Sequence, residues 1–297
     1  MEQWDGEGRL YFPKNPNGRI QRKRFLDELK GKPVQSLWDD IEMISSRSDE
    51  RLGYQTQKPE ALLERIITAS SNEGDTVIDP FCGCGTAIAV AQRLNRKWIG
   101  IDVTYLAISL IKGRLSDAYG PNVKDSYQTV GEPVSVQDAA ALAADDPYQF
   151  QLWALGLVES RPDKLKKGAD KGIDGRVFFH DEAESGKTKQ IIISVKAGKL
   201  HATYVRDLRG VVEREKAAIG VLIAMEDPTK PMRVEAASAG FYESPWKTKH
   251  PRIQILTVGE LLEGKGIDAP PSHDVRTFKK APRARRKPKD NQQEMFD

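Results

Sequence analysis

The first group of residues that could do chemistry combines two acidic side chains with a glycine-rich turn. Asp79 ends a short apolar run, Gly83 and Gly85 follow it, and Asp102 lies 23 residues after Asp79. Glycines let the backbone turn sharply and let a ligand approach the main chain. In nucleotide-binding α/β units, an acidic residue at about this spacing reaches the hydroxyl pair of a ribose. The pattern predicts a site for a nucleoside cofactor; the alternative is a simple strand-to-helix turn.

The chain around this turn alternates between helix and strand patterns. Pro59 suits the start of a helix, and apolar residues recur at helical spacing after it. Strands are expected at residues 76–78 and 98–101, and helices at residues 87–94 and 105–115. Such alternation is typical of a doubly wound α/β sheet, in which ligands bind beyond the carboxyl ends of the strands.

Two segments near the turn carry a resemblance to a known family. The turn itself reads Asp79-Pro80-Phe81-Cys82-Gly83-Cys84-Gly85-Thr86, and Thr56-Gln57-Lys58-Pro59 precedes it. Both segments resemble motifs of the DNA amino-methyltransferases, which modify adenine N6 or cytosine N4, and their order resembles the permuted β class. The resemblance covers about residues 8–115. It implies a Rossmann-like methyltransferase domain, S-adenosyl-L-methionine as methyl donor and double-stranded DNA as substrate.

The resemblance also implies roles for single residues. Asp79 and Phe81 would line the methionine and adenine side of the cofactor, Asp102 would hold the ribose, and the segment 56–59 would contact the methionine end. The implied cofactor-binding residues are Thr56, Gln57, Lys58, Pro59, Asp79, Pro80, Phe81, Gly83, Gly85, Thr86 and Asp102. Cys82 and Cys84 are expected to fill the turn, since zinc would need two more ligands nearby.

One motif of that family is absent. A Ser/Asp/Asn-Pro-Pro-aromatic tetrapeptide holds the flipped base by its amino group and stacks on its ring. The one Pro-Pro of the chain, Pro270-Pro271, is followed by Ser272. In the β class the catalytic half precedes the cofactor half. We therefore expect either a fragment of a longer enzyme or a separate polypeptide that carries the missing half, and we expect poor cofactor binding by this chain alone.

A second group of residues could support phosphodiester hydrolysis. Asp174 lies 22 residues before Lys196, which belongs to an apolar strand pattern at residues 190–197. An Asp-bound Mg²⁺ and a lysine can hold water and relieve charge on a phosphate. Residues 146–262 resemble the PD-(D/E)xK nuclease fold, and more narrowly the Mrr-type restriction endonuclease domain. The implied catalytic residues are Asp174, Ser194 and Lys196, with the metal at Asp174.

Serine at position 194 departs from that pattern. The family has Glu or Gln there, and a serine hydroxyl is a poor metal ligand, which weakens Mg²⁺ binding. The alternative interpretation is that Asp174 is a solvated turn acid and Lys196 a strand-end lysine.

The expected fold class is α/β, with a partial Rossmann-like methyltransferase domain followed by a PD-(D/E)xK nuclease-like α/β domain. The expected boundaries are residues 1–118 for the cofactor-binding part, 119–145 for a linker, 146–265 for the nuclease-like domain and 266–297 for a basic disordered tail. The favoured function is a methyltransferase segment of a restriction–modification system. The alternatives are a Mg²⁺-dependent restriction endonuclease subunit and a non-catalytic DNA-binding accessory subunit.

Composition and charge narrow the setting. No apolar run approaches the length of a membrane span, and two cysteines one residue apart fit a reducing cytoplasm. The net charge is +3, and seven basic residues lie between Lys279 and Lys289 without an acidic one, so the rest carries 3 − 7 = −4. That tail can neutralise DNA phosphates without reading sequence. Its end, Gln292-Gln293-Glu294-Met295-Phe296, resembles the peptide that docks on bacterial sliding clamps.

Overall fold

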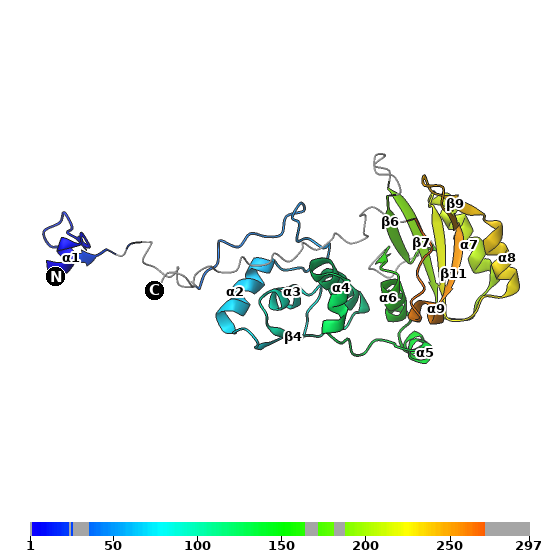
Figure 1. The fold of residues 1–297 in the computed structure, drawn as a ribbon, viewed down its shortest axis with the longest axis horizontal. Coiled ribbons are helices and arrows are strands. Elements are labelled where there is room, and N and C mark those ends of the chain that lie inside the picture. The colour runs from blue at the N-terminus through cyan, green and yellow to red at the C-terminus, as the bar shows by residue number, and fades with distance from the viewer. Residues whose placement is uncertain (1, 24, 26–35, 164–171, 181–187, 271–297) are drawn as a thin grey trace, which may run out of the picture. The chain divides into compact units, whose positions relative to one another are not determined.

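The computed structural model describes residues 2–23, 25, 36–163, 172–180 and 188–270, and the chain forms two compact units, Met1–Glu42 and Met43–Asp297 (Figure 1). The first unit contains helix α1 (Glu2–Gly6) and the antiparallel strands β1 (Leu10–Tyr11) and β2 (Gln21–Arg22). The guanidinium of Arg22 lies over the ring of Trp4, 4.4 Å from its centroid. This contact joins the strand pair to the helix.

The first half of the second unit contains two parallel strands and three helices. The glycine turn, residues 79–86, connects the first of these strands to the helix that follows it. Strand β3 (Thr76–Asp79) pairs with β4 (Lys97–Gly100), with Asp79 opposite Gly100. Helix α2 (Glu60–Ser70) precedes β3, α3 (Thr86–Arg93) connects the strands, and α4 (Tyr105–Tyr119) follows β4. A 3-10 helix, η2 (Pro121–Ser126), comes next. The alternation predicted from sequence is therefore confirmed, with boundaries shifted by a few residues at most.

This two-stranded sheet buries one face more than the other. Val77 and Trp98 pack against the cluster formed by Ile67, Val90, Ala91 and Leu94, which α2 and α3 supply. On the alternate positions, Ile78 is 61% exposed and Ile99 is 49% exposed. Ile101, just after β4, is 50% exposed. Because successive side chains of a strand point to opposite faces, these three residues leave an apolar sheet face open.

The second half of the unit is built on a mixed sheet of five strands in the order β11-β8-β7-β6-β5. β5 (Arg161–Pro162), β6 (Gly175–Phe179) and β7 (Lys189–Lys196) pair antiparallel, whereas β7, β8 (Ile219–Ala224) and β11 (Ile253–Thr257) run parallel. A separate antiparallel pair joins β9 (Phe241–Glu243) to β10 (Lys249–Pro251).

Helices cover both faces of the five-stranded sheet, which explains its apolar strands. The helices α5 (Val136–Asp145), α6 (Pro147–Leu157) and α9 (Val258–Leu262) pack on the face that carries Ile191 and Ile193. On the other face, α7 (Ala202–Arg214) and α8 (Lys230–Ser238) pack on Ile192 (Figure 1). A strand buried on both sides needs a continuous apolar run rather than an alternating one.

Some elements differ from the expectation. The segment expected to be a linker, residues 119–145, contains η2 and α5, and Ser135 and Asp138 form a capping box at the start of α5. The predicted basic tail and clamp-binding peptide lie outside the described residues, apart from residues 266–270.

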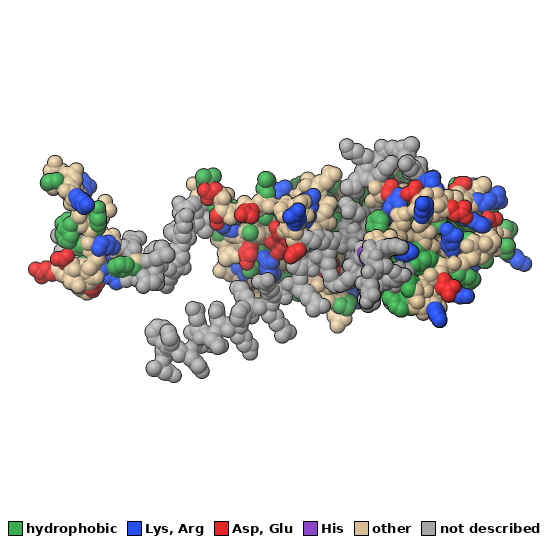
Figure 2. Space-filling view, turned by 90° about the horizontal axis from the view of Figure 1, so that it is seen from above, with side chains coloured by type: hydrophobic (Ala, Val, Ile, Leu, Met, Phe, Trp, Pro, Cys, Tyr) green, Lys and Arg blue, Asp and Glu red, His purple; other side chains and the backbone are tan. Residues whose placement is uncertain are grey.

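These helices and strands together confirm the mixed α/β class. The surface of the second unit carries both acidic and basic side chains. On the face shown in Figure 2, basic and acidic side chains are interspersed over this unit. Within the described ranges, no helix is long and apolar enough to cross a membrane.

Candidate cofactor-binding site

The site is built where β3 and β4 end. The carboxylate of Asp79 accepts a hydrogen bond from the amide of Phe81 at 3.1 Å, which starts a tight reversal of the chain. The reversed chain then returns to the end of β4, because the amide of Cys82 donates to the carbonyl of Ile101 at 2.9 Å. The predicted carboxylate therefore stands at the carboxyl edge of the sheet, where ligands bind in open α/β sheets.

Two glycines are required at this reversal. Gly83 has a φ of 50° and Gly85 a φ of 73°, in the left-handed region that other residues rarely adopt. A Cβ at Gly85 would lie 2.6 Å from the Cγ1 of Ile111 on α4, and a Cβ at Gly83 would lie 3.1 Å from the ring of Tyr54. Both glycines therefore satisfy backbone geometry and close packing at once.

Asp102 holds the turn from the side of β4. Its Oδ2 accepts from the amide of Gly83 at 2.9 Å, and its Oδ1 accepts from the amide and the hydroxyl of Thr104, each at 2.9 Å. Thr104 in turn caps α4 by accepting from the amide of Ala107. A carboxylate oxygen can accept more than one hydrogen bond, so these contacts are compatible with the expected ribose contact. They add a structural role that the sequence did not reveal.

The two predicted motifs meet around one cavity of about 200 Å³. Its lining combines both segments and consists of Tyr54, Thr56, Gln57, Lys58, Leu63, Asp79, Phe81, Cys82, Gly83, Cys84, Thr86 and Ala87. Clefts that enclose a drug-sized ligand usually measure about 300–1,000 Å³, so this cavity suits part of such a ligand. Pro59, Pro80, Gly85 and Asp102 do not line it, and Asp102 instead borders a second cavity of about 480 Å³.

Some residues of the segment 56–59 have structural duties. The side-chain oxygen of Gln57 accepts from the amide of Leu52 at 2.8 Å, and its side-chain nitrogen donates to the carbonyl of Glu50 at 2.5 Å. The ammonium of Lys58 donates to the carbonyl of Thr56 at 3.2 Å. Gln57 thus fixes the loop before the cavity, whereas Lys58 is exposed and lines the cavity.

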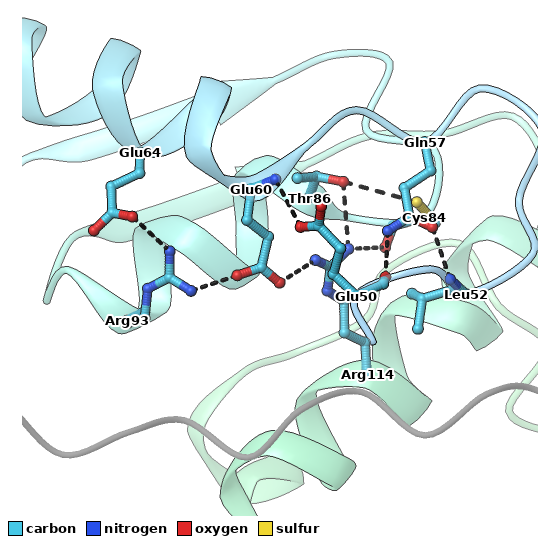
Figure 3. A network of polar contacts seen from close by, with 9 residues as sticks. All are labelled: Glu50, Leu52, Gln57, Glu60, Glu64, Cys84, Thr86, Arg93 and Arg114. Carbon is cyan, nitrogen blue, oxygen red and sulfur yellow. Dashed lines mark hydrogen bonds and ion pairs between the residues drawn. The ribbon is translucent and has the colours of Figure 1, made fainter. Parts of the chain in front are cut away.

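A charged network behind the cavity was missed from sequence. The carboxylate of Glu60 pairs with Arg93 through one oxygen and with Arg114 through the other, the latter at 2.6 Å (Figure 3). Arg114 also donates to the carbonyl of Cys84 and to the hydroxyl of Thr86, each at 3.3 Å. Glu60 and Arg114 are 54 positions apart, and no local spacing rule connects them.

The charges in this network set the pKa of Glu60. Burial alone would raise the pKa of this carboxyl, but the guanidiniums of Arg114 and Arg93 lower it further than burial raises it. Glu60 is therefore a carboxylate at neutral pH, as its two ion pairs require.

The turn also carries both cysteines of the chain, Cys82 and Cys84, which are free and buried. Burial, followed by the charges of Asp102 and Asp79, raises the pKa of the Cys82 thiol to about 11. Burial also raises the pKa of Cys84. Both groups are thiols at neutral pH. Among the described residues, no group of three or more His, Cys, Asp or Glu side chains could hold a metal ion.

The residues of the predicted nuclease-like site, Asp174, Ser194 and Lys196, lie near one another in the sheet. Asp174 directly precedes β6 and is 8% exposed, and its Oδ2 accepts from the amide of Val195 at 2.7 Å. Ser194, at 5% exposure, and Lys196 flank Val195 on β7. The ammonium of Lys196 lies 5.3 Å from the centre of the Tyr204 ring on α7. The three residues lie in one region of the sheet, and the Asp174 carboxylate is hydrogen-bonded by the Val195 backbone amide.

Comparison with known proteins assigns the two halves separately. A family described as DNA methylase matches residues 10–112, and a family described as NACHT-associated inactive restriction endonuclease 1 matches residues 149–263. The first match contains the glycine turn and the second contains the Asp174 region. Residues 10–112 are therefore similar to N6/N4 DNA methyltransferases, and residues 149–263 are similar to a restriction endonuclease family. The narrower Mrr-type assignment stays a prediction.

Several curated relatives match the first half. The type II methyltransferase M.HpaI of Haemophilus parainfluenzae is 42% identical over 120 residues, which cover 37% of this chain and 38% of that protein. M.EcaI of Enterobacter cloacae is 36% identical over 39% of this chain and 25% of its own length. The DNA adenine methyltransferase YhdJ of Escherichia coli is 47% identical over 28% of each chain. The chain thus spans about a quarter to two fifths of these relatives.

The positive φ of Gly85 yields a stability prediction. Gly85→Ala should lower the free energy of unfolding by about 2–4 kcal/mol, because it combines left-handed strain with overlap against Ile111. Urea unfolding followed by circular dichroism measures this. Gly113→Ala is the matched control, since a Cβ there meets nothing within 4 Å and its site is helical. If the Gly85→Ala protein is as stable as the Gly113→Ala protein, the predicted strain at position 85 is contradicted.

The lowered pKa of Glu60 yields a pH prediction. Because the pKa in the folded protein lies below the ordinary value of 4.5, Glu60 adds stability above that pH, and this stability is lost as pH falls through the folded-state pKa. Glu60→Gln should therefore be less stable than wild type at pH 7, and the gap should narrow below about pH 4.5. Urea midpoints between about pH 3 and pH 7 measure it. Glu64→Gln, at an exposed partner of Arg93, should show little gap at any pH.

Proposed function

We propose that this chain provides the S-adenosylmethionine-binding part of a DNA amino-methyltransferase. One observation carries the proposal: the segments 56–58 and 79–86, separate in sequence, line one cavity at the carboxyl end of the strands. Both belong to the part that matches the DNA methylase family. The boundary of this part near residue 118 is also a proposal, as is double-stranded DNA as the substrate.

The residues present fit this cofactor by charge and shape. Asp79 offers a carboxylate to its ammonium group, and the Phe81 ring, 84% exposed, offers an apolar face to an adenine. Lys58 and Thr56 offer a cation and a hydroxyl to its carboxylate. Gly83 lines the same cavity as Tyr54, and a Cβ at Gly83 would crowd the Tyr54 ring. When bound, S-adenosylmethionine supplies a methyl group activated by a sulfonium.

The groups that hold the target base must come from elsewhere. The chain has no Pro-Pro-aromatic motif, and the open face formed by Ile78, Ile99 and Ile101 is apolar. An apolar sheet face is stable when another element packs on it. These observations support a methyltransferase completed by a further polypeptide segment, on the same or another chain, that carries the base-binding motif. Its target would be adenine N6 or cytosine N4.

For the restriction-endonuclease-like half, we propose a DNA-associated role without cleavage. The Asp174 carboxylate is buried and accepts from the Val195 amide, and Ser194 stands where the resembled nuclease family has Glu or Gln. Mg²⁺ prefers several oxygen ligands, including carboxylates, in near-octahedral geometry. The matched family is itself described as inactive. A Mg²⁺-dependent endonuclease, with Asp174 as metal ligand and Lys196 beside the phosphate, is the competing proposal.

Methyl transfer tests the first proposal. Plasmid DNA and labelled S-adenosylmethionine are incubated with this chain alone and with a polypeptide encoded next to it that contains a Pro-Pro-aromatic motif. We expect incorporation with both polypeptides together, and a loss of at least tenfold with Asp79→Ala or Phe81→Ala. Glu73→Gln, an exposed acid before β3, should behave as wild type. If Asp79→Ala and Phe81→Ala methylate at the wild-type rate, the assigned cavity is not the cofactor site.

A second experiment separates structural and metal-binding roles of Asp174. If its carboxylate serves the Val195 amide, Asp174→Ala should lose about 1–3 kcal/mol of stability, whereas Asp174→Asn, which retains an acceptor oxygen, should lose less. Plasmid nicking should be absent with about 10 mM Mg²⁺ as with EDTA. Nicking that needs Mg²⁺ and disappears in both Asp174→Asn and Lys196→Ala would establish the endonuclease instead.

A further inference from the structure

Arg114 is a charged side chain in an almost fully buried place. It lies on α4 and is 3% exposed, yet it contacts the glycine turn, which is 28–30 positions earlier in the chain. One of its nitrogens donates to the carbonyl of Cys84 and to the hydroxyl of Thr86. A second nitrogen of the guanidinium pairs with Glu60. A buried guanidinium is tolerated when it is paired and hydrogen-bonded in this way.

Glu60 joins Arg114 to the other wall of the cavity. It is the first residue of α2 and directly follows the segment 56–59. Its amide donates to the carboxylate of Glu50 at 3.0 Å, which also fixes the loop that Gln57 holds. Figure 3 shows Glu60 between Arg93 and Arg114, with Arg114 reaching from α4 toward Cys84 and Thr86. One ion pair thus connects the two cofactor segments behind the cavity.

We propose that Arg114 and Glu60 are a positioning pair, which holds the glycine turn and the segment 56–58 at the separation the cofactor needs. The proposal rests on the proposed function. Neither residue lines the 200 Å³ cavity, so the pair acts through the Cys84 carbonyl, the Thr86 hydroxyl and the start of α2. Removing Arg114 takes the donor away from the Cys84 carbonyl and the Thr86 hydroxyl and leaves Glu60 paired with Arg93 alone. Removing Glu60 leaves the buried charge of Arg114 without its carboxylate. In either case the turn loses part of its support and relaxes.

The chain contains its own reporter for this effect. Its two cysteines, Cys82 and Cys84, both lie in the turn, at 6% and 3% exposure. An accessible cysteine thiolate attacks the disulfide of a reagent such as Ellman's and displaces its aryl thiolate. The thiols of Cys82 and Cys84 are buried and have raised pKa values. Under native conditions the labelling rate therefore measures how often the turn opens. A loosened turn is detected in this way without any cofactor or partner.

Arg96 provides a matched control. It is also a partly buried arginine that bonds backbone, since it donates to the carbonyl of Leu94 at 2.6 Å and to the carbonyl of Ser71 at 2.8 Å. These contacts join the ends of α2 and α3 and involve no residue of the turn. Arg96→Met should therefore cost stability as Arg114→Met does, but leave the turn in place.

The experiment compares Arg114→Met, Arg114→Lys and Glu60→Gln with Arg96→Met and wild type. We expect Arg114→Met to label with Ellman's reagent at least tenfold faster than wild type, Arg114→Lys and Glu60→Gln to fall between them, and Arg96→Met to stay within twofold. Urea midpoints measured on the same samples separate local opening from global unfolding. Arg114→Lys retains the charge, so it keeps the comparison available if Arg114→Met does not fold.

Cofactor affinity gives the second readout, with S-adenosylhomocysteine as probe in calorimetry of this chain together with the complementing polypeptide. We expect at least tenfold weaker binding by Arg114→Met and unchanged binding by Arg96→Met. Equal labelling and equal affinity for these two variants would reduce Arg114 to a structural role and overturn the positioning proposal. No binding by wild type would instead overturn the proposed function, and with it the role of the pair toward the cofactor.

Discussion

The constraint on which the site depends is the reversal of the chain directly after β3. The backbone must leave the strand at Asp79, turn through two left-handed residues and enter α3 within seven positions. Glycine adopts that conformation without steric cost, but it also gives the turn no side chains with which to hold itself. Other parts of the chain supply the restraint: the Asp102 carboxylate bonds the Gly83 amide on one side, and Arg114 bonds the Cys84 carbonyl on the other. The glycines allow the turn conformation, and contacts from distant parts of the chain fix it.

This contrast between local conformation and tertiary contacts explains which features could be predicted from the sequence. The strands and helices around the turn follow hydrophobic periodicity, so β3, α3, β4 and α4 were predicted closely. The meeting of Thr56 with Asp79 and Gly83 at one cavity followed from motif recognition. The network of Glu60 and Arg114 could not be predicted, because an ion pair across 54 positions has no periodic signature. Gln57 was assigned to the cofactor by its motif, whereas its amide bonds Glu50 and Leu52, a contact that depends on a loop conformation.

In the second half of the unit, a buried carboxylate accepts a hydrogen bond that holds two strands together. A carboxylate before one strand and a lysine on the next predict a metal site only if the carboxylate faces a ligand. Asp174 is buried, and its Oδ2 accepts from the Val195 amide, which joins β6 to β7 just beyond their paired residues. A buried carboxylate needs such donors, since leaving it without them would cost several kcal/mol. Position and spacing are thus insufficient to distinguish a catalytic carboxylate from one that serves the sheet, and Ser194 adds no second acid.

The two halves differ in how completely they bury their sheets, and this difference carries functional meaning. The five-stranded sheet has helices on both faces, and every residue of β8 is buried. The two-stranded sheet is covered on one face and exposes Ile78 and Ile99 on the other. Exposed apolar surface of this kind marks an interaction site more often than a free surface. This exposed face supports the proposal that a further polypeptide segment packs on the two-stranded sheet and carries the groups that hold the target base.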